Sequence, residues 1–234
     1  MGTPKWVFFD LGGTVFDYTF DPMAPCVAIL AHSRNPHGVS PEEVQKVADE
    51  LDATIFRLRG QSPLESHIQT YNRLLCTLLR IEPEGTPEEL ELCLWDSLSW
   101  KPTKGLVAVL GELKEMGVRK GIITNLESSG STVWRELDRQ GLRSHFDHVI
   151  CSSEYGFRKP HKMIFDVALL KAECKPVDAW YVGDTFEHDV VGAAEAGLCP
   201  VWYNPSRKAK PRDVPCLEIG TWGELPALAR EGRT

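Results

Sequence analysis

The sequence lacks the long apolar runs of a membrane protein, an excess of basic residues and any regular spacing of cysteines. Its apolar runs are far shorter than the roughly 20 residues of a membrane-spanning helix, so we exclude a membrane protein. The 26 Lys and Arg residues against 33 Asp and Glu residues give a net charge of −7. This charge argues against a nucleic acid as partner, because nonspecific binding to a polyanionic backbone needs basic residues. It is compatible with a small anionic substrate.

The seven cysteines form an odd set without a CxxC pair or another metal-ligand spacing. We therefore expect reduced thiols and a cytoplasmic location. The N-terminus lacks the basic, apolar and small-residue regions of a secretion signal, which agrees with that location. At 234 residues, with 42% hydrophobic and 25% charged residues, the chain has the composition of a soluble globular protein of one or two domains. Both a monomer and a homodimer are compatible with it.

Apolar runs alternate with helical patterns along most of the chain. Trp6 to Phe9 is a short apolar run that ends at Asp10, as in a strand buried on both faces. Further strands are expected at Lys120–Asn125, His148–Cys151, Trp180–Gly183 and Val201–Tyr203, and helices at Leu106–Met116, Ser131–Gln140, Lys162–Ala172 and Asp189–Ala196. This alternation predicts an α/β fold with a doubly wound, Rossmann-like parallel sheet.

The stretch from about residue 17 to 99 differs from the rest, because it has helical periodicity and lacks β-rich runs. We interpret it as an all-helical insertion after the first strand. The predicted domains are an α/β core of residues 1–16 and 100–234, and a helical cap of residues 17–99. Such an insertion would lie over the carboxyl ends of the strands, where open α/β sheets bind ligands.

Polar residues with chemical potential follow the predicted strands. They are Asp10, the pair Thr124 and Asn125, Lys159, and Asp184 with Asp189 five residues later. Each motif alone has an ordinary explanation as a turn, a helix cap or a solvated loop. Because the carboxyl ends of parallel strands meet at one edge, their joint occurrence favours a functional site.

These residue types fit a phosphate site with a metal ion. Asp10, Asp184 and Asp189 offer the carboxylate oxygens that Mg²⁺ binds. Lys159 offers a positive charge, and Thr124 with Asn125 offers hydrogen-bond donors for phosphoryl oxygens. Asp10 is then placed to attack phosphorus and form an aspartyl-phosphate.

With these motifs the sequence resembles the haloacid dehalogenase-like superfamily of hydrolases, most of whose members are Mg²⁺-dependent phosphatases. The resemblance covers the whole chain. The four motifs that match the family's pattern are Asp10-Leu11-Gly12-Gly13-Thr14, Thr124, Lys159, and Gly183-Asp184-Thr185-Phe186-Glu187-His188-Asp189. The helical insertion is similar to the family's type 1 cap.

The resemblance implies a role for each matching residue, on a small phosphorylated metabolite as substrate. Asp10 is the expected nucleophile and metal ligand, and Thr124 and Lys159 stabilise the phosphate and the nucleophile. Asp184 and Asp189 lie on the metal side, and the backbone carbonyl of Gly12 is a further metal contact. Asn125 is expected to bind the phosphate together with Thr124 and Lys159.

One position departs from the family's pattern. Family phosphatases usually have a second Asp two residues after the nucleophile, as general acid and base, but Gly12 stands there. Losing such a group costs about 10² to 10⁴ in rate. Three explanations are compatible with the sequence. Asp17 or a cap residue takes over the role of the missing acid, or the substrate has a leaving group that needs little protonation. The third is that the protein is a phosphate-ligand binding or regulatory protein with weak or no turnover.

Two other branches of the family fit less well. The dehalogenase branch also lacks this Asp, but it works without metal and without the carboxylate pair of Asp184 and Asp189. The phosphonatase branch needs a cap lysine, and nothing around Lys46 suggests a desolvated amine. Arg57, Arg59 and His67 are weaker candidates for contact with a substrate anion.

Overall fold

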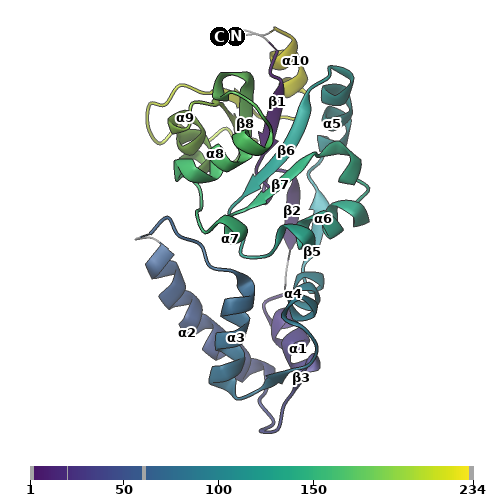
Figure 1. Cartoon of the computed structure of the whole chain (residues 1–234), viewed down its shortest axis with the longest axis vertical. Coiled ribbons are helices and arrows are strands. Elements are labelled where there is room, and N and C mark those ends of the chain that lie inside the picture. The colour runs from purple at the N-terminus through teal and green to yellow at the C-terminus, as the bar shows by residue number, and fades with distance from the viewer. Residues whose placement is uncertain (1–2, 20, 60–61, 232–234) are drawn as a thin grey trace.

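The computed structural model describes residues 3–19, 21–59 and 62–231 of the chain. It consists of a part with a central sheet and a helical part, which lie end to end along the long axis of the molecule (Figure 1). Within the described ranges, no helix combines the length and the apolar character that crossing a membrane requires.

The first part is built on a six-stranded parallel sheet with the order β10-β9-β8-β1-β6-β7. In chain order its strands are β1 (Trp6–Phe9), β6 (Arg119–Thr124), β7 (His148–Cys151), β8 (Ala179–Gly183), β9 (Cys199–Tyr203) and β10 (Leu217–Ile219). The chain adds strands first on one side of β1 and then on the other, so the strand order reverses there. The predicted doubly wound α/β fold is confirmed.

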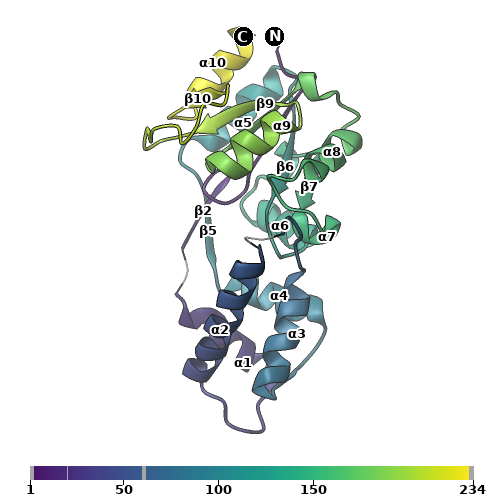
Figure 2. The same ribbon diagram turned by 90° about the vertical axis from the view of Figure 1, so that its left-hand side faces the viewer.

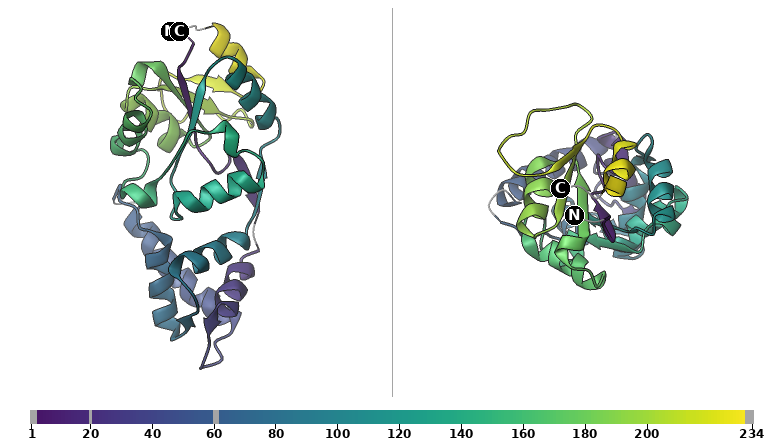
Figure 3. Two further views of the ribbon diagram at one scale, coloured as in Figure 1. Left: turned by 45° about the vertical axis from the view of Figure 1, so that its right-hand side comes forward. Right: turned by 90° about the horizontal axis from the view of Figure 1, so that it is seen from above.

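Alternate side chains of β1 explain why the sheet has a helical layer on each face. Val7 and Phe9 pack with helices α5, α6 and α10, whereas Trp6 and Phe8 pack with α8 and α9. Figure 3 shows helices on both sides of the sheet. These helices are α5 (Leu106–Glu115), α6 (Gly130–Arg139), α8 (Lys162–Lys171), α9 (Gly192–Glu195) and α10 (Glu224–Glu231). The four side chains of β1 are at most 3% exposed, as the uninterrupted apolar run predicts.

Short helical turns complete this part. They are η1 (Arg143–His145), α7 (Ser152–Tyr155), η2 (Pro176–Asp178) and the π-helical turn η3 (Phe186–Val191). The turn η3 lies where the sequence predicts a helix from Asp189, so helical structure begins three residues earlier than expected. The other predicted strands and helices of the core begin and end within two residues of their expected bounds.

The helical part has a hydrophobic core of its own. Its helices are α1 (Met23–Ala31), α2 (Pro41–Arg59), α3 (Ile68–Leu79) and α4 (Pro87–Asp96). All four bury side chains in one cluster, formed by Cys26, Ile29, Val44, Leu75, Cys76, Leu79, Ile81 and Leu90. The expectation of an all-helical insertion misses the short antiparallel pair β3 (Ser33–Arg34) and β4 (Glu82–Pro83). Strands of two residues carry no alternating pattern that a sequence could reveal.

Two antiparallel strands join the two parts. They are β2 (Phe16–Thr19) and β5 (Ser99–Pro102), and Phe16 pairs with Pro102. The predicted domain boundaries, at residues 16/17 and 99/100, fall within these strands. The strands themselves were not expected, because each has four residues and forms only by pairing across the whole insertion. The division into core and cap stays a prediction.

Helix α4 fixes the helical part against helix α6 of the core. Glu91 of α4 is 2% exposed, and its Oε1 accepts hydrogen bonds from the N–H and the hydroxyl of Ser129, both at 2.7 Å. The Thr132 hydroxyl donates to the same oxygen at 2.7 Å. The Trp95 indole N–H donates to Glu136 at 3.2 Å. These hydrogen bonds lower the pKa of Glu91, although burial opposes them, and so favour its ionised form.

A second attachment joins the segment before α3 to the part of the core around α7, which lies above α3 in Figure 2. The N–H of Glu65 donates to the Gly156 carbonyl oxygen, and the N–H of Arg158 donates to that of Pro63, both at 2.9 Å. The N–H of Ile68 donates to the Glu127 carbonyl oxygen at 2.9 Å. The helical part is therefore held to the core by two separate segments, α4 and the residues before α3.

Candidate active site

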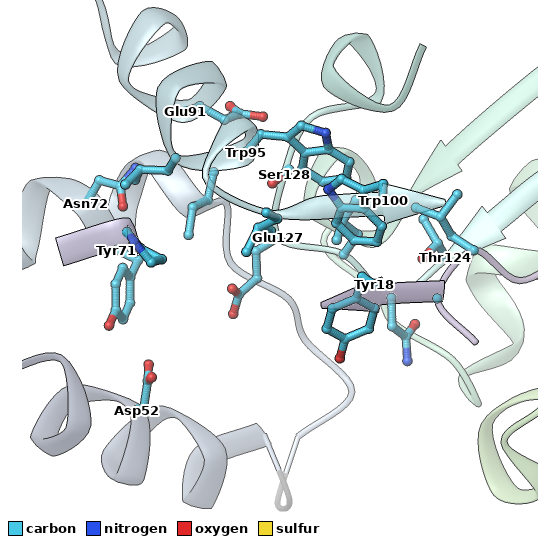
Figure 4. A pocket seen from close by; sticks show the side chains of 18 of the residues that line it. Tyr18, Asp52, Tyr71, Asn72, Glu91, Trp95, Trp100, Thr124, Glu127 and Ser128 are labelled. Carbon is cyan, nitrogen blue, oxygen red and sulfur yellow. The ribbon is translucent and has the colours of Figure 1, made fainter. Parts of the chain in front are cut away.

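The predicted site residues line one cavity of about 770 Å³ between the sheet edge and the helical part (Figure 4). They are Asp10, Gly12, Thr124, Asn125, Lys159, Asp184 and Asp189. Asp10 follows β1, Thr124 ends β6 and Asp184 follows β8, so neighbouring strands bring them together. Cavities of this size typically hold small-molecule ligands.

Lys159 is at the centre of a buried hydrogen-bond network. Its Nζ donates to Asp10 Oδ1 and to Asp189 Oδ1, both at 2.7 Å, and to the Tyr181 hydroxyl at 2.6 Å. The hydroxyl in turn donates to the Ile123 carbonyl oxygen at 2.9 Å. All three N–H donors of the ammonium therefore have partners. Burial alone would lower the pKa of Lys159, but the two carboxylates raise it, so the ammonium is charged.

Three carboxylates gather around this single ammonium. Oxygens of Asp10, Asp184 and Asp189 lie within 4.8 Å of one another. Burial raises the pKa of Asp10 to about 7, although Lys159 opposes this effect, and burial also raises the pKa of Asp184. Three carboxylates thus face one ammonium, and their burial disfavours keeping all of them ionised without a further positive charge. A hard divalent cation such as Mg²⁺, which takes oxygen ligands, fits this donor set.

Two glycines are required for the carboxylates to come this close. Gly13 has a φ of +72°, and a Cβ there would lie 2.7 Å from Asp184 Oδ2. A Cβ at Gly183 would lie 2.3 Å from Asp189 Cγ. Any side chain at either position would displace a carboxylate, because real Cβ atoms do not approach other atoms so closely.

Asn125 holds the backbone of Lys159. Its Oδ1 accepts from the Lys159 N–H at 2.6 Å, and its Nδ2 donates to the Lys159 carbonyl oxygen at 2.9 Å. The structure therefore gives Asn125 a positioning role, and its predicted contact with phosphate stays a prediction. Thr124 is 3% exposed and reaches the cavity from the end of β6.

Gly12 has room for a side chain. A Cβ at this position would lie 3.7 Å from Tyr18 Cε1, an ordinary contact distance. Tyr18 of β2 lines the cavity, whereas the neighbouring Asp17 is exposed and is not among the described lining residues. Successive side chains of a strand point to opposite faces, which explains the difference. The structure gives Asp17 no place in the cavity from which to replace an acid at position 12.

The weaker cap candidates also lie elsewhere. The His67 ring caps α3 by accepting from the Gln69 N–H at 3.3 Å. Arg59 forms ion pairs with Glu65 and Glu127. Neither residue, nor Arg57, is among the described residues that line the cavity.

Sequence reasoning missed several polar residues of the cavity and its surroundings. Tyr181 had a signal, because a tyrosine within a strand buried on both faces must find a partner for its hydroxyl. Others come from β2, from the helical part and from the loop before α6, and include Tyr18, Gln45, Asp52, Tyr71, Asn72, Glu91, Glu127 and Ser128. Their spacing along the chain gives no sign that they meet, since the packing of separate elements brings them together.

Comparisons with known proteins agree with this geometry. A family model described as haloacid dehalogenase-like hydrolase matches residues 7–202. The glyceraldehyde 3-phosphate phosphatase of Methanothermobacter thermautotrophicus is 36% identical over 227 residues, covering 89% of this chain and 89% of that protein. The pyrimidine 5'-nucleotidase YjjG of Escherichia coli is 36% identical over 129 residues, covering 54% of this chain and 56% of that protein.

Solved structures show the same fold. A HAD phosphatase from Thermococcus onnurineus superposes with a TM-score of 0.67 at 24% identity, covering 96% of this chain and 97% of that one. A 2-haloacid dehalogenase from Pseudomonas syringae superposes with a TM-score of 0.69, also at 24% identity, covering 97% and 99%. The fold is therefore common to phosphatases and dehalogenases.

Proposed function

The chain belongs to the haloacid dehalogenase-like hydrolase family, and we propose that it is a Mg²⁺-dependent phosphatase of small phosphate monoesters. The observation that carries the proposal is the position of Asp10. It follows the central strand β1, lies 2.7 Å from the Lys159 ammonium and has two further carboxylates beside it. A dehalogenase acting without metal would have no use for this acidic cluster.

Asp10 performs the first step as nucleophile. One of its carboxylate oxygens attacks phosphorus, the bond from phosphorus to the leaving oxygen breaks, and that oxygen takes up a proton. Water then attacks the phosphorus of the aspartyl-phosphate and loses a proton, so that inorganic phosphate leaves and the carboxylate is restored. Lys159 orients Asp10 through Oδ1, and the Thr124 hydroxyl donates to a phosphoryl oxygen.

The residues that would hold Mg²⁺ are Asp10, Asp184 and the backbone carbonyl of Gly12, with Asp189 on the same side. The close approach of three carboxylates, with one ammonium beside them, supports this assignment. When bound, the cation supplies positive charge that offsets both the carboxylates and the phosphoryl oxygens.

We also propose that residues 17–99 act as a cap of the family's type 1. Their separate hydrophobic core and their position over the strand ends support this role. The expected partner is a small phosphorylated metabolite, in agreement with the size of the cavity.

Gly12 favours a second candidate function, a phosphate-ligand binding or regulatory protein with weak or no turnover. This position provides no side chain to protonate the leaving oxygen, and Asp17 lies outside the cavity lining. The metal and phosphate contacts would then serve binding alone.

Hydrolysis of para-nitrophenyl phosphate, with and without Mg²⁺, tests the proposal. We expect steady Mg²⁺-dependent turnover that the Asp10→Asn variant lacks. A variant that retains the wild-type rate would overturn the assignment of Asp10. A single burst of about one nitrophenolate per protein, or no release together with micromolar binding of phosphate compounds, would support the second function instead.

A further inference from the structure

The cavity continues from Asp10 into the helical part, where four of the polar lining residues form what we call the distal subsite. They are Asp52 of α2, Tyr71 and Asn72 of α3, and Glu91 of α4. Figure 4 shows the Asp52 carboxylate and the Tyr71 hydroxyl pointing toward one another across the cavity. The surrounding walls are mostly apolar, with Ile29, Val44, Ile68 and Leu75 among them.

The distal subsite is negatively charged. Asp52 and Glu91 each bring a carboxylate, and of the described cap residues that line the cavity none is Lys, Arg or His. The basic side chains that line it, Arg158, Lys159 and His188, belong to the core and lie on the phosphate side. A second anionic group on the substrate would therefore meet like charges in a half-buried space.

Asn72 adds a requirement for hydrogen bonding. It is 3% exposed, it lines the cavity, and its Nδ2 has no hydrogen-bond partner among the described residues. Buried amide groups are normally paired, so this donor indicates a ligand with an acceptor. The Asp52 carboxylate, which already interacts with the Tyr71 hydroxyl, has room to accept a further hydrogen bond from a ligand. A hydroxyl group is both donor and acceptor, whereas an ammonium group only donates.

We propose that the distal subsite binds the uncharged, hydroxyl-bearing leaving group of a phosphate monoester and excludes leaving groups that carry a second negative charge. The proposal rests on the phosphatase function proposed above and narrows its substrate class. The phosphoryl group binds at Asp10 and Lys159, and the rest of the molecule extends toward Asp52 and Asn72. The cap thus selects by charge as well as by size.

Two substrates that differ only in the charge of the leaving group test whether the distal subsite excludes a second negative charge. Sorbitol 6-phosphate and 6-phosphogluconate have the same six-carbon chain and end in a hydroxymethyl or a carboxylate group. We expect kcat/KM to be at least tenfold higher for sorbitol 6-phosphate. In Asp52→Asn the ratio of the two kcat/KM values should fall at least threefold, mainly because 6-phosphogluconate becomes a better substrate. The exposed Glu50→Gln variant on the same helix is the control and should keep the wild-type ratio.

Equal kcat/KM values for the two esters, or an unchanged ratio in Asp52→Asn, would overturn the proposal. A second pair, glucose 6-phosphate and glucosamine 6-phosphate, separates a hydroxyl from an ammonium group. A preference for the amine above tenfold would overturn the assignment to a hydroxyl-bearing group, and comparable rates are expected.

Binding distinguishes failure of this proposal from failure of the phosphatase function. The sorbitol and gluconate esters are titrated calorimetrically, with Mg²⁺, into the Asp10→Asn variant. A tenfold difference in Kd supports the distal subsite even if no ester is turned over. Turnover without discrimination in binding or in kcat/KM overturns the subsite and leaves the phosphatase function standing.

Discussion

The Glu91 carboxylate of α4 lies 2.7 Å from both the backbone N–H and the hydroxyl of Ser129, at the N-terminus of α6. These bonds link the helical part to the core directly beside the cavity. A carboxylate in this position also interacts favourably with the positive end of the α6 dipole. The contact therefore couples the stability of the protein to the position of α4 over the site.

Replacing Glu91 with Gln should destabilise the protein by about 1.5–3 kcal/mol at pH 7, because hydrogen bonds to a charged group are lost. Urea denaturation measures the change in the free energy of unfolding. The exposed Glu88→Gln variant on the same helix is the matched control and should stay within about 0.5 kcal/mol of wild type. Equal effects of the two substitutions would contradict the importance of the Ser129 contact.

The contribution of Glu91 should also depend on pH. Burial alone would raise the pKa of Glu91, but hydrogen bonds from Ser129, Thr132 and Gln69 lower it overall. A lowered pKa in the folded state gives stability that is complete above the unfolded value of about 4.5 and is lost as the pH falls through the folded value. The difference in the free energy of unfolding between wild type and Glu91→Gln should therefore become smaller below pH 4.5. A difference in the free energy of unfolding that stays constant down to pH 3.5 would contradict an ionised Glu91.

Addition of Mg²⁺ should raise the melting temperature, because a cation relieves the repulsion among Asp10, Asp184 and Asp189. At a concentration of 100 times Kd the stabilisation is about 2.7 kcal/mol. Differential scanning fluorimetry with Mg²⁺ or EDTA measures it without substrate. The shift should disappear in Asp184→Asn and persist in Asp138→Asn, which removes an exposed carboxylate on α6. Equal shifts in both variants would place the cation elsewhere.

Introducing an acid at position 12 should accelerate hydrolysis, since a side chain there meets only an ordinary contact with Tyr18. We expect Gly12→Asp to raise kcat on alkyl phosphates by about 10² or more, and on aryl phosphates far less, because aryl leaving groups need little protonation. Gly12→Asn, of similar size but without the acid, is the control. Equal gains on both substrate classes would indicate that the native protein already has another acid.

Replacing Tyr181 with Phe should destabilise the protein by about 1–3 kcal/mol, because the Lys159 ammonium loses a buried acceptor. The turnover number should fall as well, since Lys159 then holds Asp10 less firmly. Thermal unfolding and para-nitrophenyl phosphate kinetics give the two readouts. Tyr155→Phe, in α7 outside the cavity lining, should change neither. A Tyr181→Phe variant with the stability and the turnover number of wild type would contradict a role of this hydroxyl in the network.

The core could be predicted from the sequence because its strands are buried on both faces and end in polar residues. Trp6 to Phe9 and His148 to Cys151 have their expected bounds, and the residues that follow the strands line one cavity. The sheet topology itself brings Asp10, Thr124 and Asp184 together, so local patterns were sufficient.

The contacts of the helical part could not be predicted from the sequence, because they join residues that are far apart along the chain. Glu91 meets Ser129, and Asp52 faces Tyr71, through the packing of different helices, which apolar periodicity does not specify. The pair β2 and β5 likewise forms only once the insertion has folded back. A pattern along one helix shows which face is buried, but not which partner it finds.

The pairing of β2 with β5 has a consequence for the history of the chain. Because Thr19 is paired with Ser99, both ends of the helical part leave the core side by side. Loop-closure entropy then depends little on what lies between them, and doubling the length costs only about 0.6 kcal/mol. The segment between these strands can be exchanged, lengthened or shortened without a change in the positions of the sheet and Asp10. Under the proposed function, selectivity for new substrates can therefore evolve while the residues around Asp10 stay the same.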